Sequence, residues 1–228
     1  MSFNPIENRS LHIQVFNVIK DRIVSGQMKL NEQLPPEAQL CKEFQISRTI
    51  IREAIKSLQS IGLLTVSPGK KGTAVSMPDV KLAQELIYIH LKMKETSLKE
   101  LFDVRLTLES SIARLAAVNR TEENLTALRN CMELMNKCRS LDRATELDFT
   151  FHDLIVEASQ NSVLKIYNMP LLSLQRDLRK QTINRKGLET TAQYHQELLK
   201  SIEVGNPDLA EKTMRIHIEH ALEVLQQS

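Results

Sequence analysis

The sequence of 228 residues lacks the long apolar runs that membrane proteins need. No stretch approaches the roughly 18 apolar residues of a membrane-spanning helix. The first 25 residues carry scattered charges instead of the apolar core of a signal peptide. We therefore expect a cytoplasmic protein without a membrane partner, built from two domains of ordinary size.

Cysteine and glycine are too sparse for several kinds of site. The three cysteines (Cys41, Cys131 and Cys138) form no C-x-x-C pair, so neither a zinc knuckle nor a disulfide framework is indicated, and reduced thiols are expected. The sequence has no glycine-rich phosphate loop and no His-Glu-x-x-His helix. Because no general base of that kind is present, we do not expect an enzyme.

Positive charge gathers in the N-terminal third of the chain. Residues 1–78 hold ten Lys and Arg against six Asp and Glu, a net charge of +4. Residues 79–228 hold 20 against 22, a net charge of −2. This asymmetry favours a polyanion-binding module joined to a domain with another task.

The N-terminal 76 residues follow the plan of a winged helix-turn-helix. Apolar spacing, cap residues and stop signals predict three helices, at residues 11–24, 35–44 and 48–61. Two short strands are predicted on either side of a basic turn, at residues 63–66 and 73–76. The connection between the second and third helices is as tight as a helix-turn-helix requires. Residues 77–80 are the predicted linker.

Residues 81–228 are predicted to form an all-α bundle, which makes the whole fold mainly α. Turn signals separate the predicted helices, and no strand alternation occurs. The predicted helices are 81–92, 97–119, 122–139, 143–160, 162–184, 189–204 and 207–226. In the second of these, an apolar stripe is predicted to face the core, consisting of Leu101, Val104, Leu108, Ile112 and Leu115.

The start of the third N-terminal helix carries side chains suited to DNA. Arg48 and Arg52 are four residues apart and project from one face. An arginine in the major groove can discriminate bases by about 1–3 kcal/mol through guanine. Ser47 and Thr49 can donate to phosphate oxygens, and Lys70 and Lys71 at the wing tip would add salt-dependent affinity. The alternative is a set of ordinary solvated side chains on an amphipathic helix.

The run LPPEAQLCKEFQISRTIIREAIKSLQSIGLLTVSPGKKGTAV resembles the DNA-binding domain of the GntR family of bacterial regulators. The resemblance implies a ligand-responsive regulator, expected to be a repressor, that binds a double-stranded operator with an inverted repeat as a homodimer. It assigns operator contacts to matching positions, namely Ser47, Arg48, Thr49, Arg52, Gly69 and Lys70. One position departs from the family, because Ala38 stands where many members carry a DNA-contacting arginine.

Four residues of the C-terminal part are candidates for a metal site. Asp148 and His152 are spaced i, i+4, so they share one helix face. His195 and His217 each lie about 11 residues from the turn at residues 205–206, hence at similar heights on an antiparallel hairpin. One carboxylate and three imidazoles suit Zn²⁺, Ni²⁺ or Mn²⁺. The alternative for each histidine is an ordinary core position.

Three stretches spread over residues 97–218 resemble the FCD ligand-binding domain of FadR-like regulators: LFDVRLTLESSIARLAA, DFTFHDLIVEASQN and YHQELLKSIEVGNPDLAEKTMRIHI. The resemblance implies that Asp148, His152, His195 and His217 bind a divalent metal, against which a small organic acid effector docks. It also implies that Arg105 pairs with the carboxylate of that effector. Two alternatives remain: the metal ion itself as the signal, and a metal-dependent hydrolase.

Overall fold

The computed structural model describes residues 11–66, 72–94 and 96–227. The chain divides into two compact units, Met1–Leu82 and Ala83–Ser228, and each is described by itself. The predicted mainly helical class is confirmed, with eleven helices and one two-stranded sheet in the described residues. Within those residues, no helix has the length and apolarity to cross a membrane.

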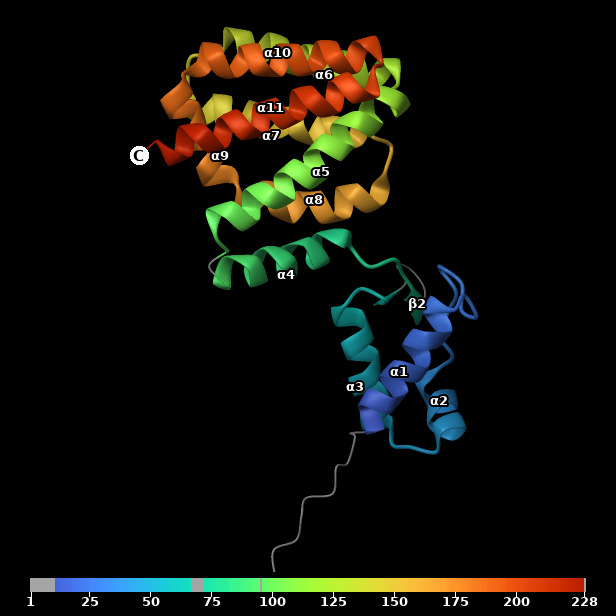
Figure 1. Cartoon of the computed structure of the whole chain (residues 1–228). Coiled ribbons are helices and arrows are strands. Elements are labelled where there is room, and N and C mark those ends of the chain that lie inside the picture. The colour runs from blue at the N-terminus through green and yellow to red at the C-terminus, as the bar shows by residue number, and fades with distance from the viewer. Residues whose placement is uncertain (1–10, 67–71, 95, 228) are drawn as a thin grey trace, which may run out of the picture. The chain divides into compact units, whose positions relative to one another are not determined.

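The N-terminal unit packs three helices and a short antiparallel hairpin around one core (Figure 1). The helices are α1 (Leu11–Val24), α2 (Glu37–Phe44) and α3 (Arg48–Ser60). The strands are β1 (Leu64–Val66) and β2 (Thr73–Val75), paired with Leu64 opposite Val75. Val15 and Ile19 of α1 pack with Ile51 and Leu58 of α3, so the helical apolar spacing produces the core.

A tight turn joins α2 to α3. Gln45 has φ 55° and ψ 41°, in the left-handed region that ends a helix, and its backbone N–H donates to the carbonyl of Cys41. Ser47 then has extended backbone angles and precedes α3. These two residues reverse the chain within three positions, which fixes the helix-turn-helix geometry.

The C-terminal unit is a bundle of eight helices, which Figure 1 shows stacked in layers. Their bounds are α4 (Val80–Met93), α5 (Leu98–Asn119), α6 (Glu122–Lys137), α7 (Leu141–Ala158), α8 (Ser162–Leu174), α9 (Arg176–Lys186), α10 (Leu188–Val204) and α11 (Pro207–Gln226). Helices α5 and α11 lie side by side along much of their length, and α10 and α11 form an antiparallel hairpin closed at Gly205. The core lies among α5, α6, α7, α10 and α11.

Helix α5 buries charged residues where an apolar stripe was predicted. Leu101 and Ile112 are buried as expected, but Val104 is 38% exposed. Arg105 and Glu109 take the buried face instead, each 3% exposed. Because buried charges need paired partners, this face of α5 marks a site rather than ordinary packing.

The single helix predicted over residues 162–184 is wrong, because the structure divides it into α8 and α9. Pro170 lies inside α8 and has no backbone N–H, so it cannot donate the usual helical hydrogen bond to the carbonyl of Ile166. Gln84 of α4 donates its side-chain amide to that carbonyl at 3.5 Å. The helix ends at Leu174, and α9 restarts in a new direction (Figure 1).

Candidate functional site

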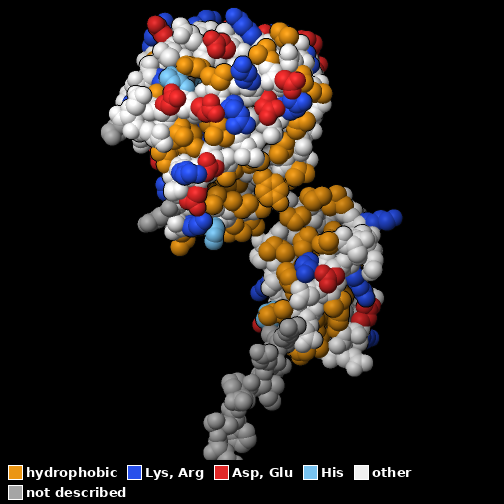
Figure 2. Space-filling model, viewed as in Figure 1, with side chains coloured by type: hydrophobic (Ala, Val, Ile, Leu, Met, Phe, Trp, Pro, Cys, Tyr) orange, Lys and Arg blue, Asp and Glu red, His pale blue; other side chains and the backbone are white. Residues whose placement is uncertain are grey.

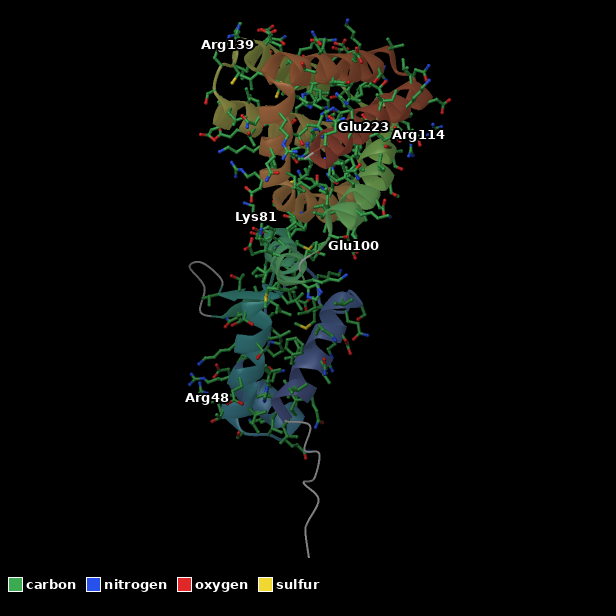
Figure 3. All side chains as sticks on the ribbon, turned by 60° about the vertical axis from the view of Figure 1, so that its left-hand side comes forward. Arg48, Lys81, Glu100, Arg114, Arg139 and Glu223 are labelled. Carbon is green, nitrogen blue, oxygen red and sulfur yellow. The ribbon has the colours of Figure 1, made fainter. Side chains whose placement is uncertain are left out.

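The start of α3 presents the side chains predicted to contact DNA. Ser47, Arg48, Thr49 and Arg52 are all exposed, and Figure 3 shows Arg48 projecting away from the N-terminal unit. The other predicted contacts, Gly69, Lys70 and Lys71, lie outside the described residues.

One acidic residue of α2 holds both arginines of this surface. Arg48 Nε lies 2.7 Å from Glu37 Oε2, and Arg52 Nε lies 3.1 Å from the same oxygen. The hydrogen bond from Arg48 is the main cause that lowers the pKa of Glu37. Since both guanidiniums share one carboxylate, their positions on the exposed face are linked.

Three histidines converge in the core of the C-terminal unit. His152 of α7, His195 of α10 and His217 of α11 each offer a ring nitrogen, and these nitrogens lie within 4.8 Å of one another. The ring centroids of His195 and His217 are 4.8 Å apart, and those of His152 and His217 are 5.3 Å apart. All three rings are buried. The turn at Gly205 therefore brings together residues that are far apart along the chain.

The histidine cluster contains buried nitrogens that the protein itself does not satisfy. Two ring nitrogens, His152 Nε2 and His217 Nδ1, have no hydrogen-bond partner among the described residues, and the only polar atom placed near His195 Nε2 there is Asp148 Oδ1, at 3.3 Å. Burial is the main cause that lowers the pKa of His152 to about 4 and the pKa of His217 well below its usual value. Buried imidazoles with free nitrogens, as His152 and His217 have, fit the requirements of a divalent metal ion.

Asp148 faces the cluster but is held by an arginine. Its Oδ1 lies 3.3 Å from His195 Nε2, and its Oδ2 accepts from Arg179 Nη1 at 2.8 Å. Burial opposes the ionisation of Asp148, but Arg179 and His195 outweigh it and lower its pKa well below the usual range. The carboxylate is thus charged and positioned beside the imidazoles.

Glu109 joins the histidine cluster to the arginines. Its Oε2 lies 2.9 Å from His152 Nδ1, and its Oε1 accepts from Arg105 Nε at 2.9 Å and from Arg179 Nη2 at 3.1 Å. Burial opposes the charge of Glu109, yet the two guanidiniums lower its pKa well below the usual value. Two carboxylates and two guanidiniums therefore form a buried, charge-balanced network beside the three rings.

A cavity of about 20 Å³ opens beside this network. It is lined by Arg105, Asp148, Arg179, Lys186, Thr191 and His217, among others. The cavity is only large enough for about one water molecule. Both basic side chains and His217 of the histidine cluster line this cavity.

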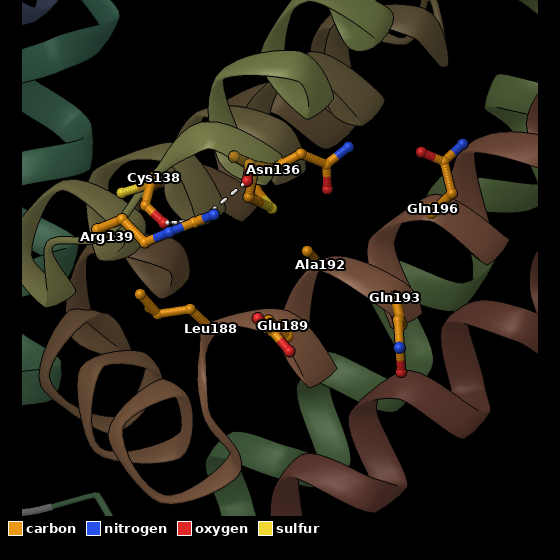
Figure 4. A pocket seen from close by; sticks show the side chains of 9 residues that line it. Asn136, Cys138, Arg139, Leu188, Glu189, Ala192, Gln193 and Gln196 are labelled. Carbon is orange, nitrogen blue, oxygen red and sulfur yellow. Dashed lines mark hydrogen bonds between the residues drawn. The ribbon is translucent and has the colours of Figure 1, made fainter.

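A larger pocket of about 320 Å³ lies between the end of α6 and the start of α10 (Figure 4). Its guanidinium, Arg139, donates to the backbone carbonyls of Asn136 and Cys138. That cation is already occupied by the protein, and the lining offers no cluster of buried polar groups. This pocket is larger than the cavity beside the histidines, but the chemistry of the lining favours the small cavity.

Comparisons with known proteins identify both units. Residues 11–75 match the bacterial regulatory proteins of the gntR family, and residues 100–220 match the FCD domain. The chain is 30% identical over 210 residues to the HTH-type transcriptional regulator LutR of Bacillus subtilis, covering 89% of this chain and 95% of LutR. The chain belongs to the GntR family of transcription regulators and carries an FCD domain.

Two further likenesses agree with this assignment. The Glc operon transcriptional activator of Escherichia coli is 32% identical over 164 residues, covering 69% of this chain and 64% of the activator. The solved structure of Streptococcus agalactiae GntR has a TM-score of 0.61 and 25% identity, covering 92% of this chain and 97% of that one. This GntR protein is a DNA-binding transcription regulator rather than an enzyme, as predicted.

Sequence reasoning missed three residues beside the histidine cluster: Glu109, Arg179 and Lys186. Glu109 had a local signal, because it lies four residues after Arg105 and interrupts the apolar face of α5. Arg179 meets its partners across 31 and 70 residues of sequence, so no local pattern reveals it. Lys186 looks like an ordinary basic residue at the end of a helix.

Proposed function

We propose that this regulator binds a divalent metal ion through Asp148, His152, His195 and His217, and that a small organic acid docks beside it. The observation that carries this proposal is the set of three buried, converging imidazoles, of which His152 Nε2 and His217 Nδ1 lack a partner among the described residues. When bound, Zn²⁺, Ni²⁺ or Mn²⁺ would supply positive charge and open coordination positions for a carboxylate.

The surrounding side chains support distinct roles in this site. Glu109 beside His152 Nδ1 orients that ring, as carboxylates behind metal-binding histidines do. Arg179 holds Asp148 in place. Arg105 Nε is bound by Glu109, whereas neither Arg105 Nη atom bonds a described residue. Because Arg105 also lines the cavity, it is the proposed partner of the effector carboxylate.

The DNA side of the proposal rests on the N-terminal unit. We propose that residues 1–76 bind DNA, with contacts from Ser47, Arg48, Thr49 and Arg52 on α3 and from Gly69, Lys70 and Lys71 of the wing. One winged helix reads a short half-site, so the proposed operator is an inverted repeat bound by a homodimer, through which the regulator represses transcription.

Residues 81–228 are the proposed effector-binding and dimerisation domain. An effector held by Arg105 of α5 and by the site at His217 of α11 would join two helices that lie side by side. Such a ligand shifts DNA binding only by its unequal affinity for the two states of the regulator. The effector is therefore expected to change operator affinity without touching DNA.

Metal loading tests this proposal directly. Wild-type protein, purified without chelator and offered Zn²⁺, is expected to hold about one ion per chain by elemental analysis. His195→Ala and His217→Ala should each lower the affinity by about 100-fold or more while remaining folded, because affinity depends on the complete ligand set. His220→Ala is the matched control, since His220 lies on the same helix as His217 but is partly exposed.

The decisive comparison is between wild type and the two ligand variants. Uptake of none of Zn²⁺, Ni²⁺ and Mn²⁺ by wild type at neutral pH would exclude the metal site. Equal loss of metal in His220→Ala would show that the effect is general to α11 and not specific to the cluster.

A further inference from the structure

Three cationic side chains, Arg105, Arg179 and Lys186, line the cavity beside the histidines. Only some of their nitrogens bond other described residues. Arg179 directs Nη1 to Asp148 and Nη2 to Glu109, so both of its terminal nitrogens are occupied. Arg105 uses only Nε, toward Glu109. Lys186 also lines this cavity. Arg105 and Lys186 are therefore the cations with capacity left for a ligand.

Lys186 differs from the two arginines because no carboxylate of the described residues forms an ion pair with it. It ends α9 half-buried, and its Nζ lies 4.5 Å from the ring centroid of Tyr194. No acidic oxygen of the described residues lies within 4.0 Å of it. Burial is the main cause that lowers the pKa of Lys186 to about 8, while the charges of Asp148 and Glu223 oppose this shift and the like charge of Arg105 adds to it. An ammonium held there is unfavourable unless an anion joins it.

Comparing the cationic and anionic side chains around the cavity indicates how many anionic groups a ligand would carry. Arg105 and Arg179 are balanced within the protein by Glu109 and Asp148. Lys186 lines the same cavity without an ion-pair partner among the described residues. A monocarboxylate docked at Arg105 would use its single anionic group there and leave Lys186 without a partner.

We propose that Lys186 binds a second anionic group of the effector, so that the effector is a short dicarboxylate. This rests on the proposed carboxylate site at Arg105 and deepens it. The hydroxyls of Thr182 and Thr191 donate to backbone carbonyls, which leaves the cationic side chains as the main donors to a second carboxylate. Ile183 and Ala221 line the same space and suit the methylene groups between the two ends.

The volume of about 20 Å³ requires a movement on binding. A dicarboxylate is larger than one water molecule, so a lining side chain has to make room. Lys186 is the half-buried member of the lining cations, and its flexible stem can leave the Tyr194 ring and close over the ligand. We therefore expect the effector to bind only when Lys186 moves.

The test compares ligands that differ only in the second carboxylate. Zinc-loaded full-length protein is titrated calorimetrically with succinate against butyrate, and with malate against 2-hydroxybutyrate. Wild type is expected to bind the dicarboxylate of a pair about tenfold more tightly, the effect of one charge-assisted contact. Lys186→Met should abolish this preference and leave the affinity for the monocarboxylate unchanged. Lys200→Met, an exposed lysine on α10, is the matched control and should behave as wild type.

The outcomes separate this inference from the site on which it rests. Equal binding of the two members of a pair by wild type would overturn the dicarboxylate proposal and leave the carboxylate site standing. A Lys186→Met variant that keeps the preference, or that loses both ligands equally, would also overturn it. If wild type binds no tested carboxylate although it holds zinc, both the inference and the proposed effector site fall.

Discussion

Lys186 shows how a binding site can oppose stability. Its pKa is lowered to about 8, chiefly by burial, against a reference value of 10.5. The charged form is thus disfavoured in the folded protein when no ligand is present. Functional sites often carry such a penalty, because a ligand rather than the protein completes them.

This penalty has a defined pH dependence. Below pH 8 both states hold the proton, so the folded protein carries the full cost of the buried ammonium. Between about pH 8 and 10.5 the unfolded state binds more protons, and the stability of the wild type rises with pH. Lys186→Met is therefore expected to be more stable than wild type at pH 7, with a difference that narrows toward pH 10.

Urea unfolding at pH 7, 8, 9 and 10, without metal or ligand, measures this difference. The Lys200→Met variant controls for the loss of a lysine as such, and its difference from wild type should stay small across the series. A Lys186→Met variant that is less stable than wild type, or a gap that is independent of pH, would contradict the expectation.

At the scale of elements, Glu37 links α2 to the start of α3. Its single carboxylate holds the guanidiniums of Arg48 and Arg52, which are 67% and 58% exposed. Such exposed pairs contribute about 0–1 kcal/mol. They nevertheless restrict two flexible side chains at the surface proposed to read bases.

Glu37→Gln is expected to lower the discrimination between operator and scrambled DNA by about three- to tenfold, because released arginines contact phosphates without fixed geometry. Affinity for scrambled DNA should rise, since one negative charge leaves a surface that faces phosphates. Titrations of both DNAs over a salt series give the ratio. Glu43→Gln is the control, because Glu43 is exposed on the same helix and bonds only Gln39. An unchanged ratio in Glu37→Gln would contradict this role.

The elements themselves were largely predictable from local signals. Thr121 and Asn206 cap α6 and α11 through their side chains, and Asn161 caps α8, each as the residue type indicates. The break between α8 and α9 was not predicted. The break lies a few residues after Pro170. A proline inside a helical pattern can indicate such a break, but the apolar spacing on both sides favoured one continuous helix.

The candidate site was predictable only in part, for a different reason. Local geometry relates the members of each pair, because Asp148 and His152 share a helix face and the turn at Gly205 sets the heights of His195 and His217. The meeting of His152 with the other two histidines depends on how α7 packs against α10 and α11. The network around Glu109 depends on how α5, α7 and α9 pack against one another. That packing is tertiary information, which the spacing along one helix does not contain.

At the scale of the whole molecule, apolar side chains stay exposed on two helices of the C-terminal unit. They are Leu86, Ile89 and Met93 of α4 and Val163 and Tyr167 of α8, each at least 42% exposed. Figure 2 shows hydrophobic side chains gathered on the lower part of this unit, where Figure 1 places α4, with α8 above it. A second copy of the chain is the proposed occupant of this surface.

Light scattering at micromolar concentration is expected to give a dimer for wild type. Leu86→Glu should weaken the dimer by about tenfold or more, because a charge would be buried in an apolar contact. Leu134→Glu is the control, since Leu134 is an exposed leucine on α6. A monomer in wild-type samples, with and without operator DNA, would exclude the proposed homodimer.

The hydrogen bond from Gln84 to the carbonyl freed by Pro170 bears on the order in which the chain folds. It joins residues 82 positions apart, so closing that loop has to precede it. During synthesis α4 leaves the ribosome well before α8 exists, whereas the core of the N-terminal unit is complete by Val75. The DNA-reading unit can therefore fold first on its own contacts. Helix α4 acquires this partner only after α5, α6 and α7 of the C-terminal unit have been made.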